Sequence, residues 1–336
     1  MKNIIISFLL FCSLSGFAQA DYFDLERRAE WIDNTFRTTA ADTFITGVAV
    51  VKIGSTYHAY ITKFENDDGI NGYAYYAKLY HASASDPRGP FNTMTHIDLS
   101  GQTWCAGSQT NGWVIVVGDK VYLYFTGTTS ETPSYPVVGT PARNNQQIGV
   151  AVADVSTPDD FTLYTGNPIL SPVSSTWNEL FVNNPAVYAG RHGGFMMAYK
   201  SATIAAPNTL EVGIAHSWHP LGPWTNAPAS IGVSDMEDPA VWWEGEFYYI
   251  ITSNTAAGGG LMFYSKDGVS SWTQVTDAAK SWRLATVNNN YTSNVRSRVE
   301  RPFILVEDGK AKCFYRFVMA QGDTTTTFNI GQLIRQ

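Results

Sequence analysis

The sequence predicts an all-β fold, specifically a five-bladed β-propeller. Helical periodicity is nearly absent, and short alternating strands separated by Gly, Asp, Asn and Pro fill most of the chain. A segment that recurs five times favours a propeller over a β-sandwich, the competing architecture. We expect a signal peptide over residues 1–20 and a single propeller domain over residues 21–336.

The first twenty residues have the character of a signal peptide. Lys2 precedes the apolar run Ile4–Leu10, and Phe17–Ala20 supplies the small residues of a cleavage site before Asp21. The apolar run is too short to span a bilayer, and no later segment is long enough to do so. We therefore expect a periplasmic or secreted protein without a membrane span.

Composition narrows the classes of partner. The net charge is −7, which argues against nucleic acid or an anionic membrane surface, because both bind basic surfaces. Aromatic residues make up 14% of the chain, so rings are available to stack on sugars. Cys105 and Cys313 are too few for a disulfide scaffold, and their pairing is left open. We expect no cofactor and predict no metal site. A structural cation at the acidic stretch Phe64–Gly72 is left open, but a solvated acidic turn is favoured because the spacing matches no known metal-binding loop.

The five repeated segments each begin with two residues, mostly polar, and continue as an apolar strand. They are Thr46–Val50, Asn111–Ile115, Asn183–Val187, Glu237–Val241 and Glu300–Ile304. The expected second strands are Tyr57–Thr62, Val121–Thr126, Gly194–Tyr199, Phe247–Thr252 and Ala311–Phe317. The expected third strands are Tyr73–Tyr80, Ile148–Val152, Leu210–His216, Gly260–Ser265 and Phe328–Leu333. This ordered recurrence predicts one blade per segment.

Two further features support a ring of blades. Several third strands end in a similar corner with Ser and Pro, most clearly in Ser85–Phe91 and Ser217–Trp224. The last blade has only three expected strands, so residues upstream of Gly47 are expected to complete it and close the ring.

The first two residues of the repeated segments are expected to converge at one end of the propeller axis. The pairs are Thr46-Gly47, Asn111-Gly112, Asn183-Asn184, Glu237-Asp238 and Glu300-Arg301. Burying such polar groups unpaired is costly, so they must pair with one another or meet a polar ligand. Both a structural polar ring and a ligand site fit this pattern.

Several motifs resemble those of a known group of enzymes. Asn184–Val187, Glu237–Trp243 and Glu300–Leu305, with the Ser217–Trp224 corner, resemble five-bladed glycosidases of the clan that contains glycoside hydrolase family 43, and more closely family 117. The resemblance covers most of the chain after residue 20. It implies carboxylates from different blades around a pocket for a terminal sugar, one of which protonates the leaving oxygen while the other acts at the anomeric carbon.

The resemblance also implies roles for individual residues. Asp238 and Glu300 correspond to the catalytic pair, and Glu237 and Arg301 would position the sugar or tune pKa values. Further substrate contacts are expected from residues at or just before the repeated segments. These are Asn111, Asn183, Asn184, Trp104 and Trp177.

The chain departs from the resembled families at two places. Family 43 has a catalytic Asp at the start of its first blade, where this chain has Thr46 and Gly47, and Asp42 is the candidate to replace it. Family 117 has a His shortly before the fifth-blade Glu, but Asn288–Val299 contains none. Candidates for that role are His58, His96, His192 and a carboxylate.

The expected function is an exported, exo-acting glycoside hydrolase with an oligosaccharide substrate from a plant or marine-algal polysaccharide. Two alternatives remain. A non-catalytic sugar-binding propeller is favoured by the missing Asp and His. A glycosyltransferase or phosphorylase on the same fold would use basic groups such as Arg301, Arg191 and His192. The sequence leaves the oligomeric state open.

Overall fold

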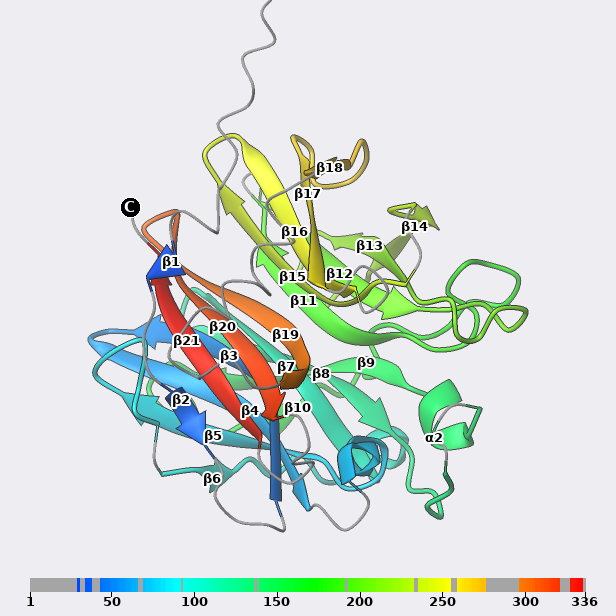
Figure 1. The fold of residues 1–336 in the computed structure, drawn as a ribbon, viewed down its shortest axis with the longest axis horizontal. Coiled ribbons are helices and arrows are strands. Elements are labelled where there is room, and N and C mark those ends of the chain that lie inside the picture. The colour runs from blue at the N-terminus through cyan, green and yellow to red at the C-terminus, as the bar shows by residue number, and fades with distance from the viewer. Residues whose placement is uncertain are drawn as a thin grey trace, which may run out of the picture.

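The protein is an all-β, five-bladed β-propeller, as the sequence predicts (Figure 1). The computed structural model describes residues 29–30, 34–37, 43–65, 69–91, 93–135, 137, 139–190, 193–232, 235–254, 259–275, 296–320 and 327–334. The expected signal peptide and Asp42 lie outside the described residues. Within the described part of the chain, no helix is long and apolar enough to cross a membrane.

Each blade is an antiparallel sheet whose strands follow one another outward from the axis. The first contains β3 (Thr43–Ile53), β4 (Thr56–Glu65), β5 (Lys78–Ala84) and β6 (Thr95–His96). The second contains β7 (Ser108–Val117), β8 (Lys120–Thr128), β9 (Gln147–Asp154) and β10 (Thr162–Leu163). The third contains β11 (Asn183–Ala189), β12 (Phe195–Ser201), β13 (Glu211–Ser217) and β14 (Thr225–Ser230). The fourth contains β15 (Glu237–Glu244), β16 (Phe247–Asn254), β17 (Gly259–Ser265) and β18 (Thr273–Val275). The fifth contains β19 (Arg296–Glu307), β20 (Lys310–Ala320) and β21 (Thr327–Ile334).

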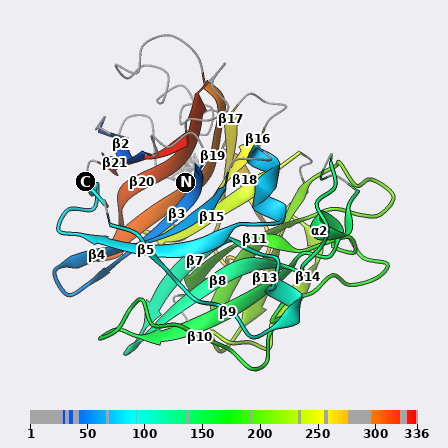
Figure 2. The same cartoon turned by 90° about the horizontal axis from the view of Figure 1, so that it is seen from below.

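Segments before the first blade complete the fifth. β1 (Ala29–Glu30) and β2 (Asn34–Arg37) both pair with β21, which confirms the expected closure of the ring. The inner strands β3, β7, β11, β15 and β19 contact one another in this order, and β19 contacts β3. Figure 2 shows these five strands gathered at the middle of the molecule.

One expected strand is wrong in its first half. Within Tyr73–Tyr80, only the residues from Lys78 onward are extended, and Gly69–Ala74 forms the short 3₁₀ helix η1. The following residue, Tyr75, donates a hydrogen bond from its hydroxyl to the Ser134 carbonyl at 2.8 Å. The segment therefore packs against the connection between β8 and β9 instead of extending the sheet.

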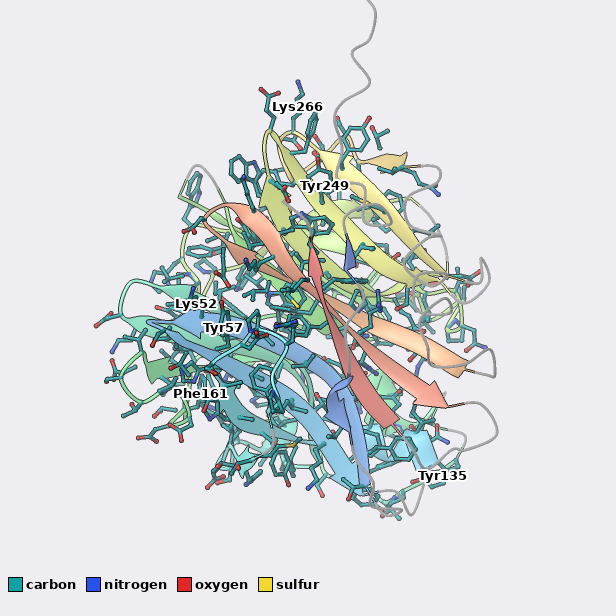
Figure 3. The ribbon with its side chains drawn as sticks, turned by 60° about the vertical axis from the view of Figure 1, so that its left-hand side comes forward. Lys52, Tyr57, Tyr135, Phe161, Tyr249 and Lys266 are labelled. Atoms are coloured by element: carbon teal, nitrogen blue, oxygen red, sulfur yellow. The ribbon has the colours of Figure 1, made fainter. Side chains whose placement is uncertain are left out.

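The two ends of the propeller differ in their connections. The inner strands begin at one end, which we call the polar end, and the hairpins between first and second strands lie at the opposite, hairpin end. Figure 3 shows Lys52 and Tyr57, from the β3–β4 hairpin, at one end of the blades and Tyr135, from the β8–β9 connection, at the other. That connection also contains the short helix α2 (Pro141–Asn144).

The apolar core is continuous between blades. Trp242 is fully buried and its neighbour Trp243 is half-buried, as expected for adjacent residues on opposite faces of a strand. Cys105 and Cys313 are both buried free thiols. Burial raises the pKa of Cys105 to about 11 and that of Cys313 to about 12, so both remain protonated near neutral pH.

The corners that follow the third strands connect neighbouring blades. In three blades a buried tyrosine of the second strand donates a hydrogen bond to the carbonyl of a corner proline in another blade. The pairs are Tyr60 with Pro158 at 2.8 Å, Tyr124 with Pro220 at 2.8 Å, and Tyr315 with Pro87. The last pair joins the fifth blade to the first, so this contact also holds the ring closed.

We predict that Tyr124→Phe lowers the free energy of unfolding by about 1–3 kcal/mol, because it leaves the buried Pro220 carbonyl without its donor. Urea unfolding of the purified chain measures the loss. Tyr122→Phe is the matched control, since Tyr122 lies on the same strand. Equal effects of the two substitutions would contradict a role for the contact between blades.

Candidate functional site

Every inner strand has one irregular step near the polar end. The register shifts there in all five β-ladders, as in a β-bulge. The residues at this step have φ between 49° and 54°, in the left-handed region; they are Gly47, Asn111, Asn184, Asp238 and Arg301. Gly, Asn and Asp tolerate this region well, whereas Arg seldom adopts it. The step brings one residue from every blade to a common cavity on the axis.

Four of these residues form a hydrogen-bonded network, which we call the axial ring: Asn111, Asn184, Asp238 and Arg301. Asn111 Nδ2 donates to Asn184 Oδ1, and Asn184 Nδ2 donates to Asp238 Oδ1. Arg301 Nη1 donates to Asn111 Oδ1 and lies 3.6 Å from Asp238 Oδ1. The cavity at the ring is about 30 Å³, room for roughly one water molecule.

The first blade contributes a glycine for a steric reason. A Cβ on Gly47 would lie 3.2 Å from Arg301 Cδ, so the stem of Arg301 occupies the space that a side chain would need. A side chain at this place in the first blade would require Arg301 to shift and would itself adopt the left-handed conformation of Gly47.

Asp238 is the only carboxylate of the axial ring and is 5% exposed. Its Oδ1 accepts from Asn184 and its Oδ2 accepts from Ser253 Oγ at 3.4 Å. Burial raises the pKa of Asp238, and the Arg301 guanidinium opposes this shift. The carboxyl group is therefore suited to hold a proton at a higher pH than an exposed Asp.

The residues one position before the ring form a second set, which we call the rim. Its members are Thr46, Thr110, Asn183, Glu237 and Glu300. Glu300 is 6% exposed. Glu237 is less buried and accepts a charge-assisted hydrogen bond from Lys200 Nζ at 3.0 Å. The two candidate catalytic residues thus occupy different positions in their blades, Asp238 in the axial ring and Glu300 in the rim.

The structure does not bring the two expected stacking rings to this site. Trp104 is 9% exposed and covers β8 and β9, where a Cβ on Gly127 or Gly149 would lie within 2.4 Å of its ring. Trp177 covers the third blade in the same way, and a Cβ on Gly213 would lie 2.1 Å from it. Both tryptophans therefore pack against the sheet that follows their own loop.

The candidate histidines also lie elsewhere. His58 is near the hairpin end, where its Nδ1 is 2.9 Å from His81 Nε2. Burial lowers the pKa of both, that of His81 to about 4. His96 is exposed on the outer strand β6, and His192 and Arg191 fall outside the described residues. Among the described residues, no group of three or more His, Cys, Asp or Glu side chains could hold a metal ion.

Sequence reasoning missed two polar residues at the polar end, Arg143 and Gln146. They come from the connection between β8 and β9, which has no counterpart in the repeat. Arg143 is 7% exposed and Gln146 is completely buried. Gln146 Oε1 accepts from the rim residue Asn183 at 2.5 Å, so these residues are contiguous with the rim.

Among the described residues, two larger cavities lie at the hairpin end. One, of about 440 Å³, continues the axial channel between the inner strands, and Lys52 and Glu307 pair at 3.2 Å at its edge. The other, of about 600 Å³, lies between the third and fourth blades beside the exposed Trp218. Neither cavity is lined by Asp238 or Glu300. These two carboxylates lie at the polar end, in the axial ring and in the rim.

No protein-family model and no curated protein sequence matches the chain. Solved structures do match. The RGII complex of BT0996 superposes with a TM-score of 0.63 at 15% identity over 92% of both proteins. Zg3597, a family 117 glycoside hydrolase of the marine bacterium Zobellia galactanivorans, gives 0.60 at 16% identity over 91% of this chain and 87% of the other. An α-L-arabinofuranosidase from Lactobacillus brevis superposes with a TM-score of 0.60 at 13% identity, over 88% of this chain and 92% of the other. The resemblance to five-bladed glycosidases is thus confirmed at the level of the fold.

The raised pKa of Asp238 predicts a pH dependence of stability. The folded protein holds this proton where the unfolded chain, with a pKa of 3.8, has released it. The stabilisation is complete below that value and is lost as the pH rises through the folded-state pKa. We therefore expect the melting temperature of the wild type, relative to Asp238→Asn, to fall as the pH rises above about 4. If the melting temperature of the wild type instead rises relative to that of Asp238→Asn as the pH increases, Arg301 has a larger effect on the pKa of Asp238 than burial has.

Proposed function

We propose that this protein is an exported glycoside hydrolase that removes a terminal sugar from oligosaccharides of plant or marine-algal polysaccharides. The observation that carries the proposal is the pair of buried carboxylates, Asp238 and Glu300, on neighbouring blades at the polar end. The shared fold with glycoside hydrolases supports it at low identity. The periplasmic or secreted location rests on the signal peptide expected from the sequence.

In this proposal the two carboxylates divide the chemistry. Asp238 protonates the leaving oxygen, because burial raises its pKa and so keeps it protonated at higher pH. Glu300 acts at the anomeric carbon, where it activates water for direct displacement or forms a glycosyl intermediate. Arg301 holds Asp238 in place from the axial ring, and the paired Glu237 and Lys200 orient sugar hydroxyls from the rim.

The proposal assigns the remaining roles to polar residues near the same end. Gly47 stands where family 43 has its first-blade Asp, and Asp42, five residues earlier in the chain, is proposed to take that role. Asn111, Asn183 and Asn184 are proposed as further contacts of the terminal sugar, because they share the axial ring and the rim with the carboxylates.

A non-catalytic sugar-binding propeller is the second candidate. One observation favours it: the side chains of the axial ring, Asp238 among them, are bonded to one another. A phosphorylase or transferase on the same fold is the third candidate. Its activity would depend on phosphate or on a sugar acceptor, which distinguishes it from a hydrolase.

We predict that Asp238→Asn and Glu300→Gln each lower kcat by at least about 100-fold, the usual contribution of a positioned acid or base. Product release from a panel of plant and algal oligosaccharides measures this, with and without phosphate. Asp154→Asn is the control, because Asp154 is an exposed carboxylate that pairs with Lys120 at the hairpin end.

Each outcome of this experiment separates the candidates. Activity in the wild type and Asp154→Asn, lost in both folded site variants, supports the proposal. Phosphate-dependent cleavage identifies a phosphorylase instead. Binding without any product identifies the non-catalytic propeller, and full activity in both site variants contradicts the assignment of Asp238 and Glu300.

A further inference from the structure

The third and fourth blades lie side by side, in green and yellow (Figure 1), but they lack the contact between tyrosine and proline that joins other blades. Where that contact exists, the tyrosine lies opposite the residue two positions after the left-handed one. In the third blade this place is taken by Ala198, which is too small to reach a neighbouring corner.

The fourth blade lacks the other half of the contact. Gly268 follows Ser265 by three residues, as the corner proline Pro220 follows Ser217 in the third blade. The φ of Gly268 is 69°, which proline cannot adopt. Between these two blades, at the hairpin end, lies the cavity of about 600 Å³, which we call the Trp218 cavity. Its volume falls within the range of about 300–1,000 Å³ that is usual for small-molecule sites.

The inner wall of the Trp218 cavity is apolar and fixed by packing. It contains Phe195 and Met196 from the third blade and Tyr248 from the fourth, all of them buried. A Cβ on Gly268 would lie 3.0 Å from the Tyr248 ring and 3.1 Å from Met196 Sδ. The corner of the fourth blade is therefore held directly against both side chains, and the wall is already formed without a ligand.

Trp218 lies at the edge of this cavity with 83% of its surface exposed. It is the most exposed large apolar side chain among the described residues. A Cβ on Gly194 would lie 3.5 Å from the indole, so the ring lies beside the β11–β12 hairpin. The indole thus presents a flat apolar surface to a ligand ring at the cavity.

Exposed polar groups of both kinds line the same cavity. His219 Nδ1 accepts from the Leu221 backbone N–H at 3.2 Å, so the neutral ring has its proton on Nε2, which is a donor. Thr225 adds a hydroxyl, which can donate and accept. The Asp267 carboxylate accepts from Ser270 Oγ at 2.7 Å, which orients it as an acceptor.

The charges at the cavity favour a neutral ligand. Asp267 is the one carboxylate among its described lining residues, and these include no Lys or Arg. Burial lowers the pKa of His216, so this histidine is uncharged near neutral pH, although Asp267 opposes the shift. An anionic sugar would be repelled by Asp267. A neutral sugar has an apolar face for the indole and hydroxyl groups for His219 and Thr225.

We propose that the Trp218 cavity is a second carbohydrate-binding site, which holds a neutral sugar unit stacked on Trp218. The inference goes beyond the proposed function, because this cavity lies at the hairpin end and is lined by neither Asp238 nor Glu300. It would hold one part of a polysaccharide while the polar end acts on a terminal sugar. A second copy of this chain, docked through Trp218, is the competing occupant.

Calorimetric titration tests this with galactotriose, arabinotriose and trigalacturonate. The parent is the full chain with Glu300→Gln, in which the probes are not consumed. We expect at least one neutral trisaccharide to bind, and Trp218→Ala to weaken its binding about tenfold or more. Trp218→Phe retains a ring and should weaken it less. Trigalacturonate should bind more weakly than the neutral probe.

The matched control is Ile204→Ala. Ile204 is 64% exposed and belongs to the same blade, but it lies in the β12–β13 connection at the polar end. We expect this variant to bind like the parent. Trp218 is exposed, so its variants are expected to fold, and their melting temperatures check this.

Three results would overturn the inference. The first is that no neutral probe binds, or that Trp218→Ala binds each of them as tightly as the parent does. The second is an equal loss in Ile204→Ala, which indicates a nonspecific apolar effect. The third is self-association in sedimentation that Trp218→Ala abolishes without any loss of sugar binding, which identifies an interface between copies.

The two proposals fail separately, because Trp218→Ala leaves the polar end unchanged. Sugar binding that depends on Trp218, without product release from any oligosaccharide by the wild type, contradicts the hydrolase and supports the second site. Product release by the wild type without such binding supports the hydrolase and contradicts the second site.

Discussion

A left-handed residue near the start of each inner strand is the constraint on which the site depends. Gly tolerates this conformation freely and Asn and Asp tolerate it well, but for most other side chains it costs about 1–3 kcal/mol and persists only where the surroundings fix it. Here four of the five steps bring a polar side chain to the axis, and each side chain of the axial ring is held by its neighbours in the ring. Arg301, the residue least suited to this conformation, packs over Gly47 and contacts both Asn111 and Asp238. Backbone geometry and side-chain pairing therefore support each other.

This arrangement places the two candidate catalytic carboxylates in different layers, Asp238 in the axial ring and Glu300 in the rim. The side chains of the axial ring bond to one another, and Arg301 lies 3.6 Å from Asp238. The rim lies one residue nearer to the end of the strands, and there the partners include residues from outside the inner strands. Glu237 depends on Lys200, which belongs to the neighbouring blade, and Asn183 reaches out to Gln146. A polar ligand at this end would meet rim residues first and Asp238 behind them.

The sequence was sufficient for the fold because each blade repeats the same pattern, and the polar pairs mark the same point in four of the five inner strands. In the second blade the expected pair Asn111-Gly112 was wrong by one residue, since the left-handed residue there is Asn111 and the equivalent pair is Thr110-Asn111. The sequence could not show that Asp238 and Glu300 lie in different layers. Asp238 is the left-handed residue of its blade, but in the fifth blade that residue is Arg301, and an arginine gives no sequence signal for this backbone conformation. Trp104 and Trp177 were expected at the pocket from their place in loops. Their true neighbours, such as Gly127 and Gly213, are distant in the chain and become contacts only in the folded sheet. Arg143 and Gln146 were missed since they lie in a connection that no other blade repeats.

The most direct test of the central claim is a crystal structure of Glu300→Gln with the oligosaccharide that the wild type binds best. We expect a terminal sugar at the polar end, within hydrogen-bond distance of the rim and of Asp238, with the five left-handed residues unchanged. A sugar bound instead in the channel at the hairpin end, or in the groove beside Trp218, with the rim untouched, would contradict this claim.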